Sequence, residues 1–517
     1  MVPVLSPEQV RAADAHTIAV QGIAALELME RAAGRCAARI MERYRAGDLG
    51  PVDGPAFVVL AGMGGNGGDG LVIARLLHAA GIPVRVVRVR HRDTPSPEHA
   101  ANWERLKAMP VPTEEYSGGA ALAIGPNELV IDAILGIGGA ALSGGPGRGG
   151  NDAVRGAIDA VRDADRPVIA VDMPSGMAAD DNTGAGPGDI MPATWTLTFE
   201  VPKLALLLPE NAACTGHWEV LPIGLDSEFI AQQRTPYHVL QEADMRTLLR
   251  ARPPFAHKGH FGHALVVAGA TGRTGAAVLA VQAALRSGAG LVTAHVPHRS
   301  LGIMQSTCPE AMCTLSGTAD HITDLPPGAW TAVGIGPGMG TQAESAQVVK
   351  RLLQDPPGPL TIDADALNII AEHRTWLGFL PAGTVLTPHP KEFDRLYGAP
   401  AASGHERLQR AREMAVRHGA TIVLKGAFTA VVGTDGQVTF NATGNPGMAK
   451  GGSGDVLTGL VAGLLAQGMA PGHAARLGAW LHGLAGDLAA ERTGMDGMTA
   501  TDLIAALPMA WQRLRHG

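Results

Sequence analysis

Residues 444–459 read GNPGMAKGGSGDVLTG, and six of these sixteen residues are glycine. Val and Leu then recur at helical spacing, which predicts a glycine loop feeding a helix with Gly454 and Asp455 in its first turn. The N–H groups and positive dipole end of such a helix favour a bound phosphate, and Asp455 could take a proton from a hydroxyl group facing it. A glycine-rich surface turn is the alternative, but a plain turn needs far fewer glycines.

The overall composition limits the classes of protein to which the chain can belong. Its 517 residues predict about two or three domains, and 46% apolar residues are enough for full cores. A formal net charge of −7 argues against a general nucleic-acid binder. Four scattered cysteines without a CxxC pair suit a reducing cytosol, so we predict a cytoplasmic protein. The sequence shows no signal-like start and no apolar stretch of bilayer length, so we predict no membrane partner.

A second glycine-rich loop, GMGGNGGDG, spans residues 62–70. The β-loop-α-β unit around it is predicted from a strand at 56–61, a helix at 71–80 and a strand at 84–89. The loop contains GxGxxG, the fingerprint of dinucleotide-binding folds. The acidic residue that such folds place after the second strand is missing, and Arg88 and Arg90 stand there instead. The fingerprint alone is therefore a weak signal.

Polar side chains lie near the ends of three predicted strands in this half, at 56–61, 129–135 and 167–171. Because ligands bind at the carboxyl ends of strands in an open α/β sheet, we expect these side chains to converge. They are Asn66, Asp69, Asp132, Asp172 and Ser175. Their oxygen atoms suit a hard cation. Alternatively, each residue only caps a helix or a turn.

Four stretches of this half resemble, in order, the N-terminal domain of the NAD(P)H-hydrate epimerases. They are LELMERAAG (26–34), GGNGGDG (64–70), DAILGIG (132–138) and VDMPSG (171–176). The resemblance implies a Rossmann-like three-layer domain, with potassium ligands at Asn66, Asp132 and Ser175 and a catalytic role for Asp172. It also implies hydrate-nucleotide contacts at Gly65, Asn66, Gly67, Gly68, Asp69, Gly136, Ile137, Gly138, Gly139, Ala140, Ala141, Leu142 and Asp172.

The second half of the chain alternates strands with helices. Strands are predicted at 265–268, 291–296, 332–335, 360–362, 385–387 and 422–424. They end in Gly, Asp, His or Lys, as ligand-binding strand ends do. The pattern predicts a doubly wound α/β sheet with helices on both faces.

The glycine-rich stretch 444–459, together with HPKE (389–392) and HKG (257–259), resembles the ADP- or ATP-dependent NAD(P)H-hydrate dehydratases. The resemblance runs from about residue 240 to near the C-terminus and implies a ribokinase-like fold. It implies hydrate-nucleotide contacts at Ala276, Gly338, His389 and Asp455, with Asp455 catalytic. It places the adenine nucleotide at Lys425, Gly426, Ala427, Phe428, Thr429 and Gly454. Gly65 departs from the epimerase pattern, and Lys391 and Lys450 depart from the dehydratase pattern.

Joined in one chain, the two halves resemble the bifunctional NAD(P)H-hydrate repair enzymes. This implies an epimerase domain at 1–224, a linker at 225–240 and a dehydratase domain at 241–517. The expected substrates are the hydrates of NADH and NADPH, with ADP or ATP as co-substrate. We expect K⁺ in the epimerase domain, Mg²⁺ in the dehydratase domain and assembly as a homo-oligomer.

The implied dehydration has a physical logic, since hydroxide is a poor leaving group and phosphate a good one. Asp455 would take the hydroxyl proton while Lys425, the helix N-terminus and Mg²⁺ neutralise charge during phosphoryl transfer. A ribokinase-like small-molecule kinase with a regulatory first half is one alternative. An NADP-linked oxidoreductase that uses GxGxxG and a non-catalytic nucleotide sensor are two others.

Overall fold

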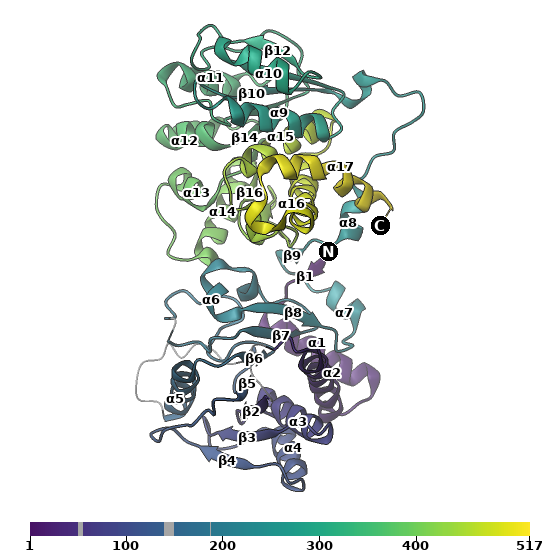
Figure 1. The fold of residues 1–517 in the computed structure, drawn as a ribbon, viewed down its shortest axis with the longest axis vertical. Helices are drawn as coiled ribbons and strands as arrows, with labels where there is room; N and C mark the ends of the chain where they lie inside the picture. Colours follow the sequence, from purple (N-terminus) through teal and green to yellow (C-terminus); the bar gives the residue numbers. More distant parts are fainter. Residues whose placement is uncertain (50–54, 139–148, 187, 517) are drawn as a thin grey trace. The chain divides into compact units, whose positions relative to one another are not determined.

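The structure is a computed structural model, which describes residues 1–49, 55–138, 149–186 and 188–516 (Figure 1). Its contacts divide the chain into two compact units. We call Val2–Thr235 the N-terminal unit, and Pro236–Gly517 together with Met1 the C-terminal unit. All four cysteines are free thiols. In the described ranges, no helix combines the length and apolarity needed to cross a membrane.

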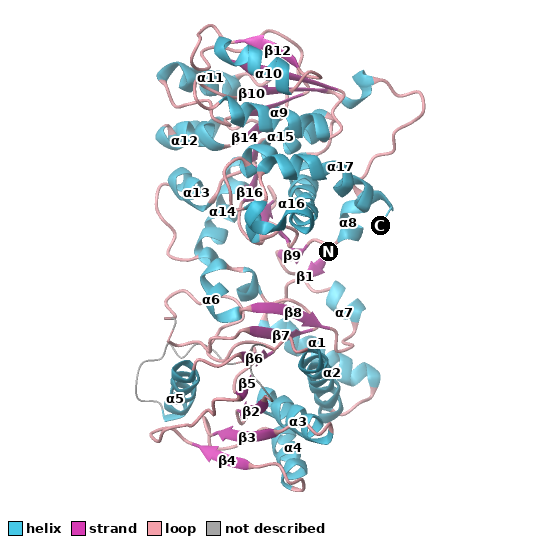
Figure 2. Ribbon diagram, in the orientation of Figure 1, coloured by secondary structure: helices cyan, strands magenta, loops and turns pink. Residues whose placement is uncertain are grey.

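The N-terminal unit is built on one sheet of seven parallel strands in the order β4-β3-β2-β5-β6-β7-β8 (Figure 2). The strands of the unit are β1 (Val2–Pro3), β2 (Ala56–Ala61), β3 (Val84–Val89), β4 (Thr113–Tyr116), β5 (Glu128–Ala133), β6 (Val168–Val171), β7 (Trp195–Phe199) and β8 (His217–Leu221). The helices are α1 (Pro7–Gln21), α2 (Ala25–Ala46), α3 (Gly65–Ala79), α4 (Pro97–Lys107), α5 (Gly149–Ala164), α6 (Ala212–Thr215) and α7 (Ser227–Ala231).

Strand β2 shows how this sheet becomes the middle of three layers. Successive side chains of a strand point to opposite faces, so Phe57 and Val59 pack with α2 and α3. Val58 and Leu60 pack with α5 on the other face. Figure 1 shows α5 on the opposite side of the sheet from α2 and α3. The Rossmann-like three-layer prediction is confirmed.

The order of the strands creates a crevice at the middle of the sheet. The chain runs from β2 outward to β3 and β4, and then returns to β5 on the other side of β2. The loops after β2 and β5 therefore separate at the carboxyl edge, where open α/β sheets bind their ligands. The N-terminal stretch before β2 holds two separate helices, because Gly22 ends α1 in the left-handed conformation with φ 64°.

The C-terminal unit carries a mixed sheet in the order β9-β18-β17-β16-β15-β14-β13-β10-β11-β12. The strands are β9 (Tyr237–Val239), β10 (His263–Val267), β11 (Leu291–Val296), β12 (Met312–Leu315), β13 (Ala332–Ile335), β14 (Leu360–Ile362), β15 (Val385–Leu386), β16 (Thr421–Leu424), β17 (Thr429–Val432) and β18 (Val438–Asn441). The helices are α8 (Glu242–Thr247), α9 (Thr274–Arg286), α10 (Leu301–Thr307), α11 (Ala343–Gln354), α12 (Ala364–Glu372), α13 (Pro390–Tyr397), α14 (Gly404–His418), α15 (Ser453–Ala466), α16 (Pro471–Gly497) and α17 (Ala500–His516).

Strands β10 to β16 pair in parallel, and β17 pairs antiparallel with both β16 and β18. The direction of winding reverses at β10, which has β11 on one side and β13 on the other. Helix α15 packs against α9, β10 and β13 and is buried from Val456 to Ala466. A helix that is apolar on all sides belongs in a core, so the N-terminus of α15 has a fixed place at the sheet edge.

The segment at 225–240, predicted as a linker, is not free of secondary structure. Helix α7 packs Ile230 into a core of the N-terminal unit, and strand β9 pairs in parallel with β18 of the C-terminal unit. The division between the units lies inside this segment, between Thr235 and Pro236. The weak periodicity of the segment reflects two short elements, each of which belongs to a different unit.

Candidate active sites

The glycine loop of the N-terminal unit combines packing positions with cavity-wall positions. A Cβ on Gly62 would lie 2.0 Å from the Ile134 carbonyl oxygen, and one on Gly67 would lie 1.7 Å from the Gly62 carbonyl oxygen. These glycines let β2, β5 and α3 approach closely, which no side chain would permit. A Cβ on Gly65 would meet no atom within 4 Å, so the departure from the epimerase pattern leaves open space there.

A cavity of about 690 Å³ lies at the carboxyl edge of this sheet. The predicted contacts that line it are Gly65, Asn66, Asp69, Gly136, Ile137, Gly138 and Asp172. Gly67 and Gly68 are buried within α3 and do not line the cavity. Gly139, Ala140, Ala141 and Leu142 lie outside the described residues.

Asp172 and Lys203 form a buried ion pair at the wall of this cavity, with Nζ 2.6 Å from Oδ1. Asp172 follows β6 with a φ of 65°, a left-handed conformation that is uncommon for a non-glycine residue. Lys203 also donates to the Thr198 hydroxyl at 2.8 Å and to the Phe199 carbonyl at 2.9 Å. All three ammonium protons thus have acceptors, and the role of Lys203 is to position Asp172.

Asp132 and Ser175 meet at the end of β5, as predicted. The Ser175 hydroxyl donates to Asp132 Oδ1 at 2.5 Å, and its backbone N–H donates to Oδ2 at 2.7 Å. Burial raises the pKa of the Asp132 carboxyl to about 6. The Asn66 side chain lies over Gly136, and its buried Nδ2 has no hydrogen-bond partner. The oxygen atoms of Asp132, Ser175 and Asn66 are chemically suited to a hard cation, whereas the unpartnered Nδ2 is a donor that calls for an acceptor.

Asp14 of α1 also lines the cavity, and sequence reasoning missed it. Burial and the nearby Asp172 carboxyl raise the pKa of Asp14 to about 6. Burial likewise raises the pKa of Asp69 well above its usual range. The cavity thus holds two carboxyl groups that resist ionisation and one, Asp172, that is paired with a lysine.

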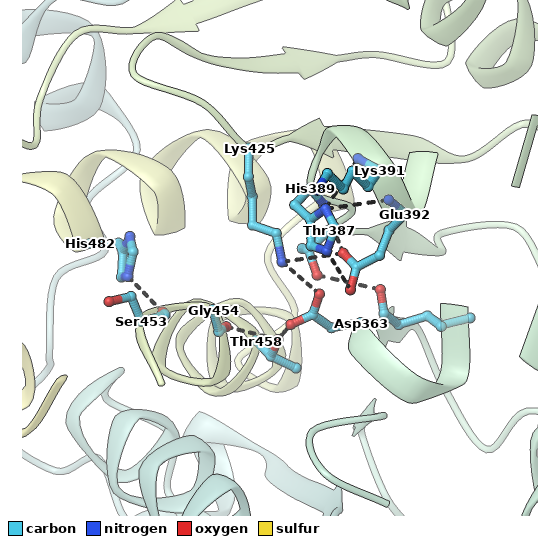
Figure 3. Close-up of polar contacts among 11 residues, drawn as sticks. Asp363, Thr387, His389, Lys391, Glu392, Lys425, Ser453, Gly454, Thr458 and His482 are labelled. Atoms are coloured by element: carbon cyan, nitrogen blue, oxygen red, sulfur yellow. Dashed lines mark hydrogen bonds and ion pairs between the residues drawn. The ribbon is translucent and has the colours of Figure 1, made fainter. Parts of the chain in front are cut away.

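In the C-terminal unit, side chains from three strand ends meet around Lys425 (Figure 3). Lys425 follows β16, and its Nζ lies 2.9 Å from Asp363 Oδ1, after β14. Glu392 of α13 lies farther away, 3.8 Å from the same ammonium. The Thr458 hydroxyl of α15 donates to Asp363 Oδ2 at 2.7 Å. Asp363, which is only 2% exposed, therefore links β14, β16 and α15 at the site.

The glycine loop of residues 444–459 lies where the sequence predicts, at the N-terminus of α15. Gly452 caps the helix with a φ of 95°, and Gly454 and Asp455 lie in its first turn. A Cβ on Gly454 would lie 3.3 Å from the Lys425 ammonium, so glycine keeps the space in front of that charge open. Asp487 of α16 accepts hydrogen bonds from Gly444 N–H and Asn445 Nδ2, which ties the loop to the core.

The helix dipole at the N-terminus of α15 favours the ionised form of Asp455, but burial acts in the opposite direction. Burial raises the pKa of Asp455 to about 7, and the Asp363 carboxyl adds to the rise. The Lys425 ammonium acts in the opposite direction but does not offset these effects. A carboxyl with a pKa near 7 is well matched to a general base at neutral pH.

The HPKE stretch (389–392) caps the N-terminus of helix α13. The His389 imidazole accepts from the N–H groups of Lys391 and Glu392, while the Glu392 carboxylate accepts from His389 N–H at 2.8 Å. This capping box begins α13 and fixes Glu392 beside Lys425. Lys391 is exposed at the helix start, where its side chain reaches toward solvent.

The remaining predicted contacts fall on two loops of the same sheet edge. A Cβ on Gly338, after β13, would lie 3.0 Å from Ala276 Cβ of α9, so these two residues are neighbours. Residues 425–429 form the turn between β16 and β17, where the Thr429 hydroxyl donates to the Gly426 carbonyl at 3.0 Å. A Cβ on Gly426 would meet no atom within 4 Å, which leaves this turn open to a ligand.

Two further residues support the loop instead of facing a ligand. Lys450 donates to the carbonyl groups of Asp496 and Met498, so it holds the C-terminal end of α16. His482, half-buried in α16, is hydrogen-bonded to the Ser453 carbonyl at 2.9 Å (Figure 3). Burial lowers the pKa of this imidazole to about 4. Lys450, which departs from the dehydratase pattern, therefore has a structural role at the end of α16.

Known proteins match both halves of the chain. A family model described as YjeF-related protein N-terminus matches residues 25–205, and one described as NAD(P)H-hydrate dehydratase matches residues 264–509. The bifunctional NAD(P)H-hydrate repair enzyme of Moorella thermoacetica is 39% identical, over 96% of this chain and 94% of its own. The Escherichia coli enzyme of the same name is 34% identical, over 97% of this chain and 92% of its own. The chain belongs to the family of bifunctional NAD(P)H-hydrate repair enzymes.

A solved structure of the ADP/ATP-dependent NAD(P)H-hydrate dehydratase from Bacillus subtilis is 31% identical. It covers 54% of this chain and 98% of its own, with a TM-score of 0.47. Membership of the bifunctional repair family extends over both units, so a kinase whose first half only regulates is the less supported alternative.

Proposed function

We infer that the chain repairs hydrated nicotinamide nucleotides. It interconverts the R and S forms of NAD(P)H hydrate, and it dehydrates the S form to NAD(P)H at the expense of ADP or ATP. Family membership over the whole length supports both activities. The observation that carries the proposal is the presence of one built polar site at the carboxyl edge of each sheet.

For epimerisation we propose the cavity of the N-terminal unit. Asp172, oriented by Lys203, would act on the hydroxyl-bearing ring carbon, and the open wall at Gly65 would admit the nucleotide. Asn66, Asp132 and Ser175 would hold K⁺, which supplies a fixed positive charge for the substrate's phosphates. Among the described residues, no group of three or more His, Cys, Asp or Glu side chains could hold a metal. An oxygen-based K⁺ site therefore fits better than a zinc site.

For dehydration we propose the N-terminus of α15. Lys425 and the N–H groups around Gly454 would bind the transferred phosphoryl group, and the turn at 425–429 would bind the adenine nucleotide. Asp455 would take the proton of the hydrate hydroxyl as that oxygen attacks phosphorus. Mg²⁺ would be held mainly by the nucleotide phosphates, whose charge it would neutralise, because Asp363 and Glu392 already pair with the ammonium. We place the epimerase domain at 1–224 and the dehydratase domain at 241–517.

One assay tests this function against its alternatives. The protein is incubated with a mixture of R and S NADH hydrate and ADP or ATP, and the NADH absorbance band is followed. Complete conversion of both epimers to NADH is expected in K⁺ buffer. In K⁺-free buffer conversion should stop when the S form is consumed, and a strong zinc chelator should have no effect. A stable phosphate ester without NADH would indicate a kinase, and no reaction would contradict the proposed function.

A further inference from the structure

Asp14 is an acidic residue in a place where the helix pattern calls for an apolar one. It lies on α1 one turn from Val10 and Thr17, both of which are buried. Residues at these spacings share one face of a helix, so Asp14 belongs to the face that packs inward. Its carboxyl lines the cavity of the N-terminal unit. In the part of the chain that the structure describes, this carboxyl accepts no hydrogen bond and forms no ion pair.

The position of Asp14 is set by contacts on both sides of it. Ser6 and Gln9 form a capping box that begins α1. Val10 and Ala13 pack into a core with Leu28. The Thr17 hydroxyl accepts from the Asp226 N–H at 2.9 Å. These contacts hold the helix against the cavity, so the carboxyl has a fixed location although nothing binds it.

Asp172 provides the contrast on the same cavity. Its Oδ1 accepts from Lys203 at 2.6 Å, from Thr198 at 3.2 Å and from Phe199 N–H at 3.1 Å. Its Oδ2 therefore remains for a ligand. Two carboxyl groups that face one cavity in such different surroundings are the arrangement by which enzymes separate an acid from a base.

We propose that Asp14 is a catalytic residue of epimerisation and works with Asp172 as an acid–base pair on opposite faces of the substrate ring. This rests on the proposed function of the cavity. The hydrate carries its hydroxyl on the carbon next to the ring nitrogen, so the nitrogen lone pair can form a double bond to that carbon as the C–O bond breaks. The Asp14 proton goes to the departing oxygen, which leaves as water.

The second half of the reaction restores the hydroxyl on the other face. The Asp172 carboxylate takes a proton from a water molecule while the water oxygen bonds to the ring carbon. The electron pair of the carbon–nitrogen double bond returns to nitrogen. One water has left and one has entered, and the proton has moved from Asp14 to Asp172. The opposite conversion uses the two carboxyl groups in exchanged roles.

The charges around Asp14 favour the protonated form that this step needs. Burial and the Asp172 carboxyl raise its pKa to about 6, Glu200 adds to the rise, and Lys203 lowers it. Asp69 of α3 faces the same region. The other charged or titratable groups on the cavity wall are Arg11, His91, Arg92 and Glu98. Epimerisation should therefore fall about tenfold per pH unit above pH of about 6, where the pair loses its single proton.

The test compares Asp14→Asn with wild type and with Glu104→Gln, the loss of an exposed carboxyl group on α4. Epimerisation by Asp14→Asn should be about 10²–10⁴-fold slower, while dehydration of the S form is unchanged. Asp14→Glu should restore part of the rate, and Glu104→Gln should behave as wild type. In ¹⁸O-labelled water, wild type should place ¹⁸O in the recovered hydrate as fast as it epimerises, and Asp14→Asn should not.

Several outcomes would overturn the assignment. If Asp14→Asn epimerises at the wild-type rate, or if Asp69→Asn instead loses the reaction, Asp14 is not the acid. If Asp14→Asn is slow but keeps the wild-type pH profile, its role is only structural. Binding of the hydrate to Asp14→Asn, measured by thermal shift, guards against a folding defect. A wild-type protein that does not epimerise would instead contradict the proposed function itself.

Discussion

In the N-terminal unit an ion pair joins Asp172 and Lys203 at 2.6 Å, and in the C-terminal unit one joins Asp363 and Lys425 at 2.9 Å. The two lysines differ in what else they touch. Lys203 is 1% exposed and its three protons have acceptors, whereas Lys425 is 22% exposed and faces the space left by Gly454. In the first site Lys203 positions Asp172, whereas in the second site Asp363 positions Lys425.

Each pair also lies beside a carboxyl group with a raised pKa, Asp14 at about 6 and Asp455 at about 7. In both cases burial is the largest cause and a neighbouring carboxyl is the second. In the reactions that we propose, each site moves a proton at the hydroxyl of the same hydrate. The proposed sites would then carry out the same proton transfer on two different sheets, one without and one with a phosphate acceptor.

The largest expected effect is the loss of dehydration when Asp455 is replaced by Asn. Asn in its place keeps the shape but removes the base, so dehydration should slow by about 10²–10⁴-fold. Epimerisation should be unaltered, because its residues lie on the other unit. The matched control is Asp502→Asn, a half-buried aspartate in the first turn of α17. NADH formation at a near wild-type rate in Asp455→Asn would rule out this base.

The two lysines should differ in what their loss does to nucleotide binding. Lys203→Met leaves the Asp172 carboxylate buried without its partner, which should lower the free energy of unfolding by about 3–5 kcal/mol. Lys425→Met leaves Asp363, which is 2% exposed, without its partner, so it should also destabilise, and it should in addition raise the KM for the adenine nucleotide. Chemical denaturation and nucleotide titration measure the two effects. An unchanged KM for the nucleotide in Lys425→Met would remove the distinction between the two lysines.

The pH dependence of dehydration should report Asp455. Its ionised form is the base, and its pKa is raised to about 7, so kcat/KM should rise about tenfold per pH unit below 7 and level off above it. Because the Lys425 charge lowers this pKa, Lys425→Met should move the rising limb to higher pH. A profile that is flat between pH of about 5 and 8 would exclude a base with this pKa.

The smallest effect concerns the glycine loop of the N-terminal unit. Gly65→Ala should change the free energy of unfolding by less than about 0.5 kcal/mol, since its Cβ meets no atom within 4 Å. Gly67→Ala should cost about 1–3 kcal/mol or more, because its Cβ would lie 1.7 Å from a backbone oxygen. Thermal unfolding of the two variants provides the measurement. The reverse order would mean that the loop does not pack as described.

Sequence patterns were sufficient where the signal is local. The strands at 56–61, 84–89 and 291–296 are confirmed to the residue, because each is a run rich in apolar residues that begins directly after a proline or a glycine. Asp455 and Lys425 were predicted as site residues for the same reason, since a glycine loop or a strand end marks each. The antiparallel strands β17 and β18 were missed, although the Asp435-Gly436 pair between them is a hairpin turn signal, because the prediction followed the alternation of strands with helices.

The residues that sequence reasoning missed are those whose neighbours come from elsewhere in the chain. Asp14 belongs to a helix, and only the fold brings it beside Asp172. Its one sequence signal is an acidic residue on the apolar face of α1. Asp363 was noticed only as part of a strand-end motif, and its contacts with Lys425 and Thr458 depend on three separate elements.

The central claim, that each unit holds its own complete proton-transfer site, is tested most directly by complementation. Asp14→Asn and Asp455→Asn are given the pure R hydrate with nucleotide, separately and mixed, and R, S and NADH are quantified over time. Asp14→Asn should leave R unchanged, Asp455→Asn should convert R to S and stop, and the mixture should form NADH. Absence of NADH from the mixture, or loss of both reactions in either variant, would contradict the account.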